Sequence, residues 1–156
     1  MNIRMATLAD IPACVDFGQR ICAATRYSRF AYDRQRTAQQ LQQLIGVGQV
    51  RGSHCVLLAV HGEADPPVAG LLMGCIESHL FSPERVASVI NYAVLPGCRL
   101  SGAGLRLLQA FRRWAENRGA VEISLGINSG VQIERTDRFL RRLGFEHLGG
   151  HYCLRL

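Results

Sequence analysis

The chain has 156 residues, of which 48% are hydrophobic and 19% are charged, and its 18 basic residues are all arginine. This length and composition predict one globular domain over residues 1–156 and exclude a disordered or fibrous chain. No apolar run reaches about 18 residues, which argues against a membrane span, and no apolar leader opens the chain, so we expect a cytoplasmic protein. The net charge of +6 suits an anionic ligand, but a nucleic-acid partner is the weaker interpretation because no RNA-binding motif accompanies the charge.

Hydrophobic periodicity and turn residues divide the chain into predicted strands and helices. In the first part of the chain, the pattern predicts a strand over 2–6, a helix from a capping box at Thr7 and Asp10 through Ile21, an irregular segment over 24–33, and a helix over about 34–45. Three strands are then predicted, over 54–60, 68–78 and 86–94. The last part is predicted to contain a helix over about 102–118, a strand over 121–125, a helix over about 131–142, and a closing hairpin of 145–148 and 151–156. The predicted order is βααβββαβαββ, an α/β chain of the α+β type.

Six cysteines lie inside apolar segments and share no C-x-x-C spacing. Such cysteines are typical of buried free thiols in a reducing compartment, so we predict neither a disulfide framework nor a metal site. Cys98 differs from the others because it precedes Arg99 in a loop rich in glycine. A helix N-terminus and a cation at that place favour a more reactive thiol.

The loop over 99–104, with the sequence R-L-S-G-A-G, lies between the predicted strand 86–94 and the helix that follows it. Main-chain N–H groups at a helix N-terminus lack helical partners, and the helix dipole favours an anion there. Gly102 and Gly104 lack a Cβ, so a phosphate can approach the main chain, and Arg99 can add charge-assisted hydrogen bonds. The loop therefore predicts an anion site, with a glycine-rich turn that binds nothing as the alternative.

Three anion-binding motifs compete for this loop. A Walker loop needs a lysine, which the chain lacks, and a dinucleotide fingerprint needs a third glycine where Leu107 stands. The pattern R/Q-x-x-G-x-G/A, by contrast, is matched at every defined position by Arg99, Gly102 and Gly104. In this motif the chain resembles the GNAT superfamily of N-acetyltransferases, in which the loop binds the pyrophosphate of acetyl-CoA.

The resemblance extends over nearly the whole chain. The predicted element order matches the family's fold, a mixed and largely antiparallel central sheet that is flanked by helices and split at its centre. The segment R-F-L-R-R-L-G-F over 138–145 resembles the F-Y-x-x-L-G-F motif near the family's C-terminus. The resemblance implies a GNAT-like acyltransferase domain, which transfers an acyl group from acetyl-CoA or another acyl-CoA to an amine acceptor without a metal ion.

In this family the pantetheine arm of CoA lies in a gap between the fourth and fifth strands. By resemblance, Ala93 and Val94 face that arm, Arg99 binds the pyrophosphate, and Asn128 helps to hold CoA after the fifth strand. The resemblance also implies pyrophosphate contacts from the main chain of six consecutive residues, Leu100, Ser101, Gly102, Ala103, Gly104 and Leu105. A turn or helix-capping role is the alternative for Asn128.

The catalytic groups of the family are not all matched. Leu140 stands where the family motif carries the tyrosine often used as the acid, and the strand over 86–94 lacks the carboxylate often used as the base. Glu77 and His79, two residues apart near a strand end, are predicted to share one face and are candidates for a base that acts directly or through water. Tyr92 and Tyr152 are candidates for the acid. Surface or core roles are the alternatives for all of these candidates.

The family places part of its acceptor site between the first two helices, where this chain reads R-Y-S-R-F-A-Y over 26–32. By resemblance, Arg26, Tyr27, Arg29 and Tyr32 are acceptor-binding candidates. Arginines together with aromatic rings suit an acceptor that carries a carboxylate or a phosphate. Packing between helices is the alternative.

Three functions are compatible with these residues. The first is an acyl-CoA-dependent N-acyltransferase that holds the thioester and an amine of a small molecule, peptide or protein in one ternary complex, where the amine attacks directly. The second is a catalytically weak acyl-CoA-binding protein, which the leucine at position 140 favours. The third is an acetyltransferase toxin that acts on aminoacyl-tRNA, which the size and charge permit. Each of the three is compatible with a homodimer.

Overall fold

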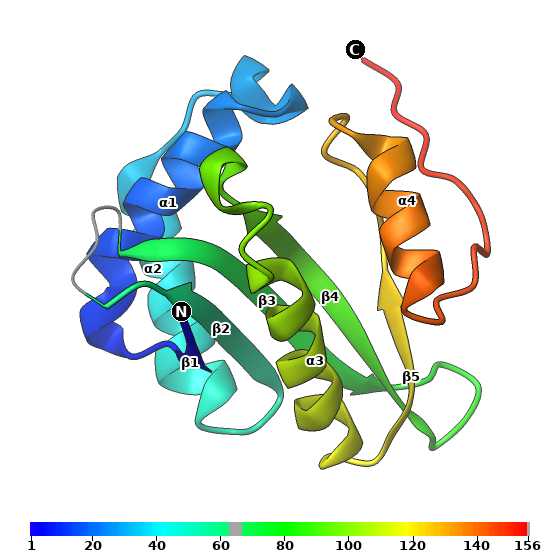
Figure 1. Cartoon of the computed structure of the whole chain (residues 1–156). Coiled ribbons are helices and arrows are strands. Elements are labelled where there is room, and N and C mark those ends of the chain that lie inside the picture. The colour runs from blue at the N-terminus through cyan, green and yellow to red at the C-terminus, as the bar shows by residue number, and fades with distance from the viewer. Residues whose placement is uncertain (63–66, 156) are drawn as a thin grey trace.

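The computed structural model describes residues 1–62 and 67–155, which form one mixed sheet (Figure 1). Its five strands follow the spatial order β1 (Asn2–Met5), β2 (His54–Val60), β3 (Val68–Ser78), β4 (Arg85–Val94) and β5 (Ala120–Leu125). Neighbouring strands from β1 to β4 are antiparallel, and β5 runs parallel to β4. The prediction of a mixed, largely antiparallel sheet flanked by helices is confirmed.

Helices cover both faces of the sheet in the described part of the chain. On one face lie α1 (Ile11–Ala23) and α2 (Arg34–Gln43), and on the other lie α3 (Ala103–Glu116) and α4 (Ile133–Arg142). Shorter helical turns connect the larger elements, namely η1 (Leu8–Asp10), η2 (Arg26–Arg29), η3 (Leu44–Gln49) and η4 (Pro96–Cys98). No helix among the described residues is both long enough and apolar enough to cross a bilayer.

The inner strands separate two apolar clusters, one under each pair of helices. On β2, Cys55 and Leu57 belong to the cluster beneath α3, whereas Val56 and Leu58 belong to the cluster beneath α1 and α2. Successive side chains of a strand point to opposite faces, so a strand that is covered on both sides must be apolar throughout. This requirement explains the continuous apolar run from which the buried strand is predicted.

The position of α3 is fixed by aromatic packing on β3. Phe111 is fully buried, and its ring stacks on that of Trp114 with 5.5 Å between the ring centroids. The Phe111 ring also lies directly over Gly74 of β3, where a Cβ would overlap the ring. Because α3 is held this closely against the sheet, the loop that precedes the helix has a defined place beside the end of β4.

The predicted capping box at the start of the first helical segment is present. The main-chain N–H of Thr7 donates to Asp10 Oδ2 over 2.8 Å, and the Arg4 guanidinium donates to both carboxylate oxygens of Asp10. The hydrogen bonds from Arg4, followed by those from Thr7, hold the pKa of Asp10 well below its ordinary value. The charged carboxylate therefore ties β1 to the turn that leads into α1.

Asp10→Asn is expected to lower the free energy of unfolding by about 1 kcal/mol at pH 7, because the substitution removes a charge-assisted cap. A depressed folded-state pKa stabilises the fold above the unfolded-state pKa of about 3.9, and this contribution is lost as the pH falls through the folded-state pKa. Urea unfolding at pH 7 and pH 3 should show a smaller difference between wild type and Asp10→Asn at pH 3. The exposed Glu146→Gln is the control, and an equal deficit at both pH values would contradict the interpretation.

The closing hairpin is the part of the fold prediction that is wrong. Residues 145–155 contain no strand, and the segment runs back along α4 instead (Figure 1). Phe145 packs against the cluster beneath α3, but Leu148, Tyr152 and Leu154 are all exposed, so no apolar face holds a hairpin to the sheet. A smaller difference concerns the helix predicted over about 34–45, because α2 passes directly into η3 and helical structure continues to Gln49.

Candidate active site

The gap expected between the fourth and fifth strands is present. The pairing of the two strands ends at Val89 on β4 and Leu125 on β5, which leaves residues 90–94 without a partner on that side. At the same place the register between β3 and β4 shifts, and Ile90 becomes an extra, bulged residue. A bulge bends its strand and increases the local twist, so the end of β4 diverges from β5.

The gap opens into a cleft with a volume of about 930 Å³. Its walls include residues of α1, η2, α2, the end of β4, the start of α3, the loop over 126–132 and α4, and these segments meet where β4 and β5 end (Figure 1). Pockets that hold small molecules and cofactors are typically of this size. The cleft brings together several predicted site residues, among them Tyr92, Ala93, Val94, Arg99, Gly102, Gly104 and Asn128.

The loop before α3 has the geometry of an anion cradle. Gly102 caps the helix in the left-handed conformation, with φ at 77°, and open space surrounds the place where a Cβ would stand. Among the described residues, none accepts a hydrogen bond from the main-chain N–H of Gly102, Gly104 or Leu105. Arg99 lines the cleft and forms no ion pair with any residue in the described ranges. Unpartnered donors and a cation therefore converge on one end of the cleft.

Gly104 has a structural role in addition to the predicted one in ligand binding, which stays a prediction. A Cβ on Gly104 would collide with the hydroxyl of Tyr92, so the glycine makes room for this side chain and not only for a ligand. Burial raises the pKa of Tyr92, which keeps the phenol protonated and able to donate a hydrogen bond. The Tyr92 hydroxyl thus lies beside the first turn of α3, at the cradle.

Gly104→Ala is expected to destabilise the protein by about 1–3 kcal/mol, because the new methyl group overlaps the Tyr92 hydroxyl. In a Tyr92→Phe background the same change should be neutral or stabilising, because the overlap is gone and alanine favours a helix by about 1 kcal/mol over glycine. Urea unfolding of the two single variants and the double variant measures this coupling. Strictly additive effects would show that the two residues do not share the space.

Glu77 and His79 do not lie in the cleft. Glu77 pairs with Val86 near the beginning of β4, at the opposite end from the cradle, and His79 lies in the turn after β3. Both side chains are exposed, and neither lines the cleft. His79 accepts a hydrogen bond from the main-chain N–H of Phe81, which is an ordinary turn contact. The shared sheet face was a reasonable prediction, but the register places the pair far from the gap.

The four acceptor candidates divide into two groups. Tyr27 and Tyr32 line the cleft, although the Tyr32 hydroxyl already donates to the main-chain oxygen of Val15 over 2.9 Å. Arg26 and Arg29 lie on η2 with Tyr27, at what we call the rim of the cleft, and are not part of its lining. The Arg26 guanidinium donates to the main-chain oxygen of Asn128, and Arg29 Nη2 lies 3.7 Å from Cys153 Sγ.

His151 is a cleft residue that the sequence did not reveal. Its imidazole packs over Gly126 at the end of β5, where a Cβ would lie 2.8 Å from His151 Nε2. Among the described lining residues, His151 is the only histidine, and none is Asp or Glu. No sequence motif marks this histidine, because the C-terminal segment reaches the gap through its path along α4.

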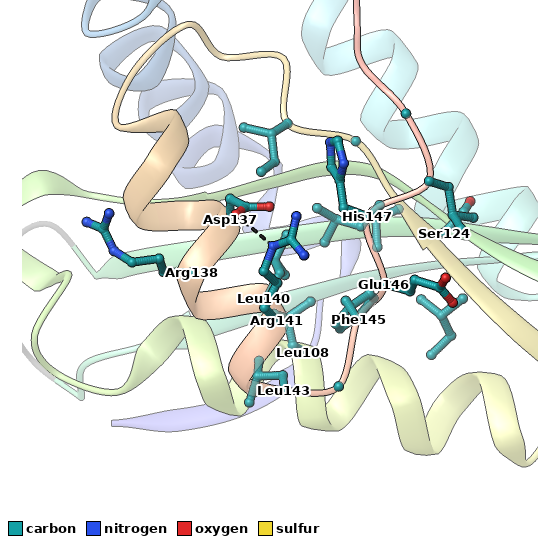
Figure 2. Close-up of a pocket in the computed structure, with 18 of the residues that line it drawn as sticks. Leu108, Ser124, Asp137, Arg138, Leu140, Arg141, Leu143, Phe145, Glu146 and His147 are labelled. Carbon is teal, nitrogen blue, oxygen red and sulfur yellow. Dashed lines mark hydrogen bonds and ion pairs between the residues drawn. The ribbon is translucent and has the colours of Figure 1, made fainter.

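A second, open cavity of about 1370 Å³ lies between β5, α3, α4 and the C-terminal segment (Figure 2). Leu140 lies there among Leu108, Leu143 and Phe145, and only 6% of it is exposed. The residue at the position of the family tyrosine is therefore part of the core and does not line the cleft, whereas its neighbour Phe139 does.

The six cysteines are free thiols that differ in burial. Cys14, Cys55 and Cys75 are buried, as the prediction of buried thiols requires, whereas Cys22 and Cys98 are partly buried and Cys153 is exposed. Cys98 lies just before the cradle, with its Sγ 4.0 Å from His61 Nε2, but it does not line the cleft. Residues 1–62 and 67–155 contain no group of three or more His, Cys, Asp or Glu side chains arranged to hold a metal ion.

A family model described as the acetyltransferase (GNAT) family matches residues 21–145, which include the cradle and the strands on either side of the gap. The chain belongs to the GNAT family. This assignment agrees with the gap between β4 and β5 and with the glycine-rich loop at the start of α3. GNAT proteins are acetyltransferases, and acetyl-CoA is the acyl donor that the family implies.

Solved structures share this GNAT fold over almost their whole lengths. A probable acetyltransferase is 18% identical with a TM-score of 0.77, covering 100% of this chain and 98% of its own. An aminoglycoside acetyltransferase from an uncultured soil metagenomic sample is 17% identical with a TM-score of 0.76, covering 99% and 95%. Glucosamine-6-phosphate N-acetyltransferase from Arabidopsis thaliana is 12% identical with a TM-score of 0.77, covering 99% and 97%. A search of curated protein sequences returned no match.

Proposed function

We propose that this GNAT protein is an acyl-CoA-dependent N-acyltransferase that transfers an acetyl group from acetyl-CoA to an amine by direct attack in a ternary complex. The observation that carries the proposal is the continuous cleft, which has an anion cradle at one end and α1, η2 and α2 around the other. Such a cleft can hold a thioester and an amine together, and proximity of this kind lowers the barrier for attack.

The cleft residues suit CoA. Gly102 leaves open space above the main chain, and the N–H groups of Gly102, Gly104 and Leu105 have no acceptor among the described residues. Arg99 supplies a positive charge for the pyrophosphate. Ala93 and Val94 lie on the unpaired end of β4, where they can contact the pantetheine arm. Acetyl-CoA supplies an activated acyl group, and the residues of the chain bind it and orient it in the gap.

His151 is the residue we assign to proton removal. A protonated amine cannot attack a thioester, so a group in the cleft or a water molecule must accept its proton. Because the described lining residues include neither Asp nor Glu, His151 is the available side-chain base, and it lies at the end of β5 beside the gap. Protonation of the leaving thiolate is left to water or the Tyr92 hydroxyl.

The second candidate is an acyl-CoA-binding protein without efficient chemistry. The burial of Leu140 in the core favours it, because the position that carries an acid in the family motif offers no proton donor here. The two similar enzymes named for their acceptors act on small amines, an aminoglycoside and glucosamine 6-phosphate, so small amines are the first class to test.

Thiol release from acetyl-CoA with a panel of amines separates the two candidates. If the protein is a transferase, we expect an amine to raise the rate of free CoA release above the rate of acetyl-CoA hydrolysis. Tight CoA binding measured by calorimetry, together with no release on any amine, would favour the binding protein. A weak or undetectable affinity for CoA would exclude both functions.

A further inference from the structure

We propose that the acceptor end of the cleft takes an amine that also carries an anionic group, either a carboxylate or a phosphate, and disfavours polycationic amines. The inference rests on the proposed function, because it assumes that the end of the cleft formed by α1, η2 and α2 receives the acceptor. The supporting observations are the distribution of carboxylates, the uncharged lining at this end, and the arginines at its rim.

Carboxylates are absent from the described lining of the cleft. Half of the ten carboxylates in the described ranges are already paired with arginines elsewhere, namely Asp10, Asp16, Glu116, Glu134 and Asp137. Four line the second cavity behind β5, namely Glu122, Glu134, Asp137 and Glu146. A polycation that entered the cleft would lose water without gaining a counter-charge, and this is costly.

The lining contributed by α1, η2 and α2 is uncharged. Its members are apolar or carry hydroxyl, thiol or amide groups, namely Cys14, Phe17, Gly18, Ile21, Cys22, Tyr27, Thr37, Gln40 and Leu41. Such a surface suits the apolar body of a small molecule. It gives no stabilisation to a protonated amine, so the acceptor amine is favoured in its neutral and reactive form.

Positive charge is concentrated at the rim of this uncharged surface. Arg26 packs over the Tyr27 ring with 4.8 Å between its Cζ and the ring centroid, and Arg29 packs over the Phe30 ring with the corresponding distance at 4.7 Å. Neither arginine forms an ion pair with a described residue. Arg135 of α4 does line the cleft, and it also forms no ion pair with a described residue.

The contacts of these arginines keep them beside the cleft. The main-chain N–H of Arg26 donates to the main-chain oxygen of Ser129, and its side chain donates to that of Asn128, so η2 is tied to the loop after β5. Arg29 reaches Cys153, two residues beyond His151 in the chain. Guanidinium groups held in place bind carboxylates and phosphates well, because less side-chain entropy is lost on binding.

Calorimetry on the full chain saturated with CoA tests the proposal through matched probes. L-Phenylalanine and phenethylamine differ by a carboxylate, O-phosphoethanolamine and ethanolamine differ by a phosphate, and spermidine is the polycation. We expect the anionic member of at least one pair to bind about tenfold more tightly than its partner, as one charge-assisted contact provides. The pair that shows the difference identifies the anion. Spermidine should bind more weakly than the preferred anionic probe.

Two arginine variants test whether the preference for an anionic acceptor comes from the arginines at the rim. Arg29→Gln should reduce the anionic preference several-fold, whereas Arg36→Gln, on the exposed side of α2 and outside the cleft lining, should leave it unchanged. Equal binding within both pairs, no binding of any probe, or spermidine as the tightest ligand would overturn the proposal. The proposed function is tested separately by acetylation of the bound probe. Selective binding without turnover would contradict the transferase and leave the binding preference standing.

Discussion

Replacing Gly102 with aspartate is expected to weaken CoA binding by about a hundredfold while the protein stays folded. Gly102 is the N-cap of α3 in the left-handed conformation. Aspartate is a favourable N-cap residue and tolerates this conformation better than most side chains, so the helix should survive. The new carboxylate would accept hydrogen bonds from the cradle and repel the pyrophosphate. Two like charges about 4 Å apart near a protein surface cost a few kcal/mol, which corresponds to this loss of affinity.

Calorimetric titration with CoA measures the effect, and Gly102→Asn is the matched control. Asparagine has the same shape as aspartate and the same tolerance of the left-handed conformation, but no charge. We therefore expect a much smaller loss of CoA affinity for Gly102→Asn than for Gly102→Asp. If a folded Gly102→Asp protein bound CoA as tightly as wild type, the cradle would not be the pyrophosphate site.

His151→Gln is expected to lower kcat about a hundredfold on any amine that the protein acetylates, the lower end of what a general base contributes. Glutamine fills a similar space over Gly126 but cannot take a proton from the amine. CoA affinity should stay unchanged, because the imidazole lies at the end of β5 and the cradle lies at the start of α3. The loss should therefore appear in kcat and not in the KM for acetyl-CoA.

His147→Gln is the control for this variant. His147 belongs to the same C-terminal segment, but it lines only the second cavity (Figure 2), whereas His151 also lines the cleft. Its replacement should leave kcat within a factor of about two, since it meets neither the thioester nor the amine. An unchanged kcat for His151→Gln would assign proton removal to water, and equal losses for both variants would indicate a structural effect of the segment.

Most of the fold was predictable because its signals are local. Helical spacing of apolar residues marks α3, and the continuous apolar run over 54–60 marks a strand buried on both faces. The hairpin prediction over 145–156 failed because two short apolar segments on either side of Gly149 and Gly150 indicate only a local preference for a turn. A terminal hairpin also needs an apolar face against the sheet, and the exposed Tyr152 and Leu154 do not provide one.

In the candidate site, too, features encoded by local sequence were predictable, whereas contacts between separate elements were not. The cradle was predictable because one loop contains all of its parts, from Arg99 to Gly104. The close approach of the Tyr92 hydroxyl to Gly104, which leaves no room for a Cβ there, is a contact between β4 and α3. The spacing of residues within one loop cannot reveal such a contact. The prediction put Glu77 near the site because the alternation of side chains along a strand indicates which face a residue occupies. It does not indicate which end of the strand lies at the gap. His151 arrives through the path of the C-terminal segment, which no local pattern encodes.

The proposed transfer of an acetyl group in the cleft can be tested by mass spectrometry of the N-acetylated amine, in parallel reactions of wild type and Gly102→Asp with acetyl-CoA. We expect an N-acetylated product with wild type, and a large loss of that product with Gly102→Asp at acetyl-CoA concentrations near the wild-type KM. Equal product with both proteins would show that the cleft between β4 and β5 is not where acetyl-CoA reacts. No N-acetylated product from wild-type protein that binds CoA tightly would contradict the assignment as a transferase.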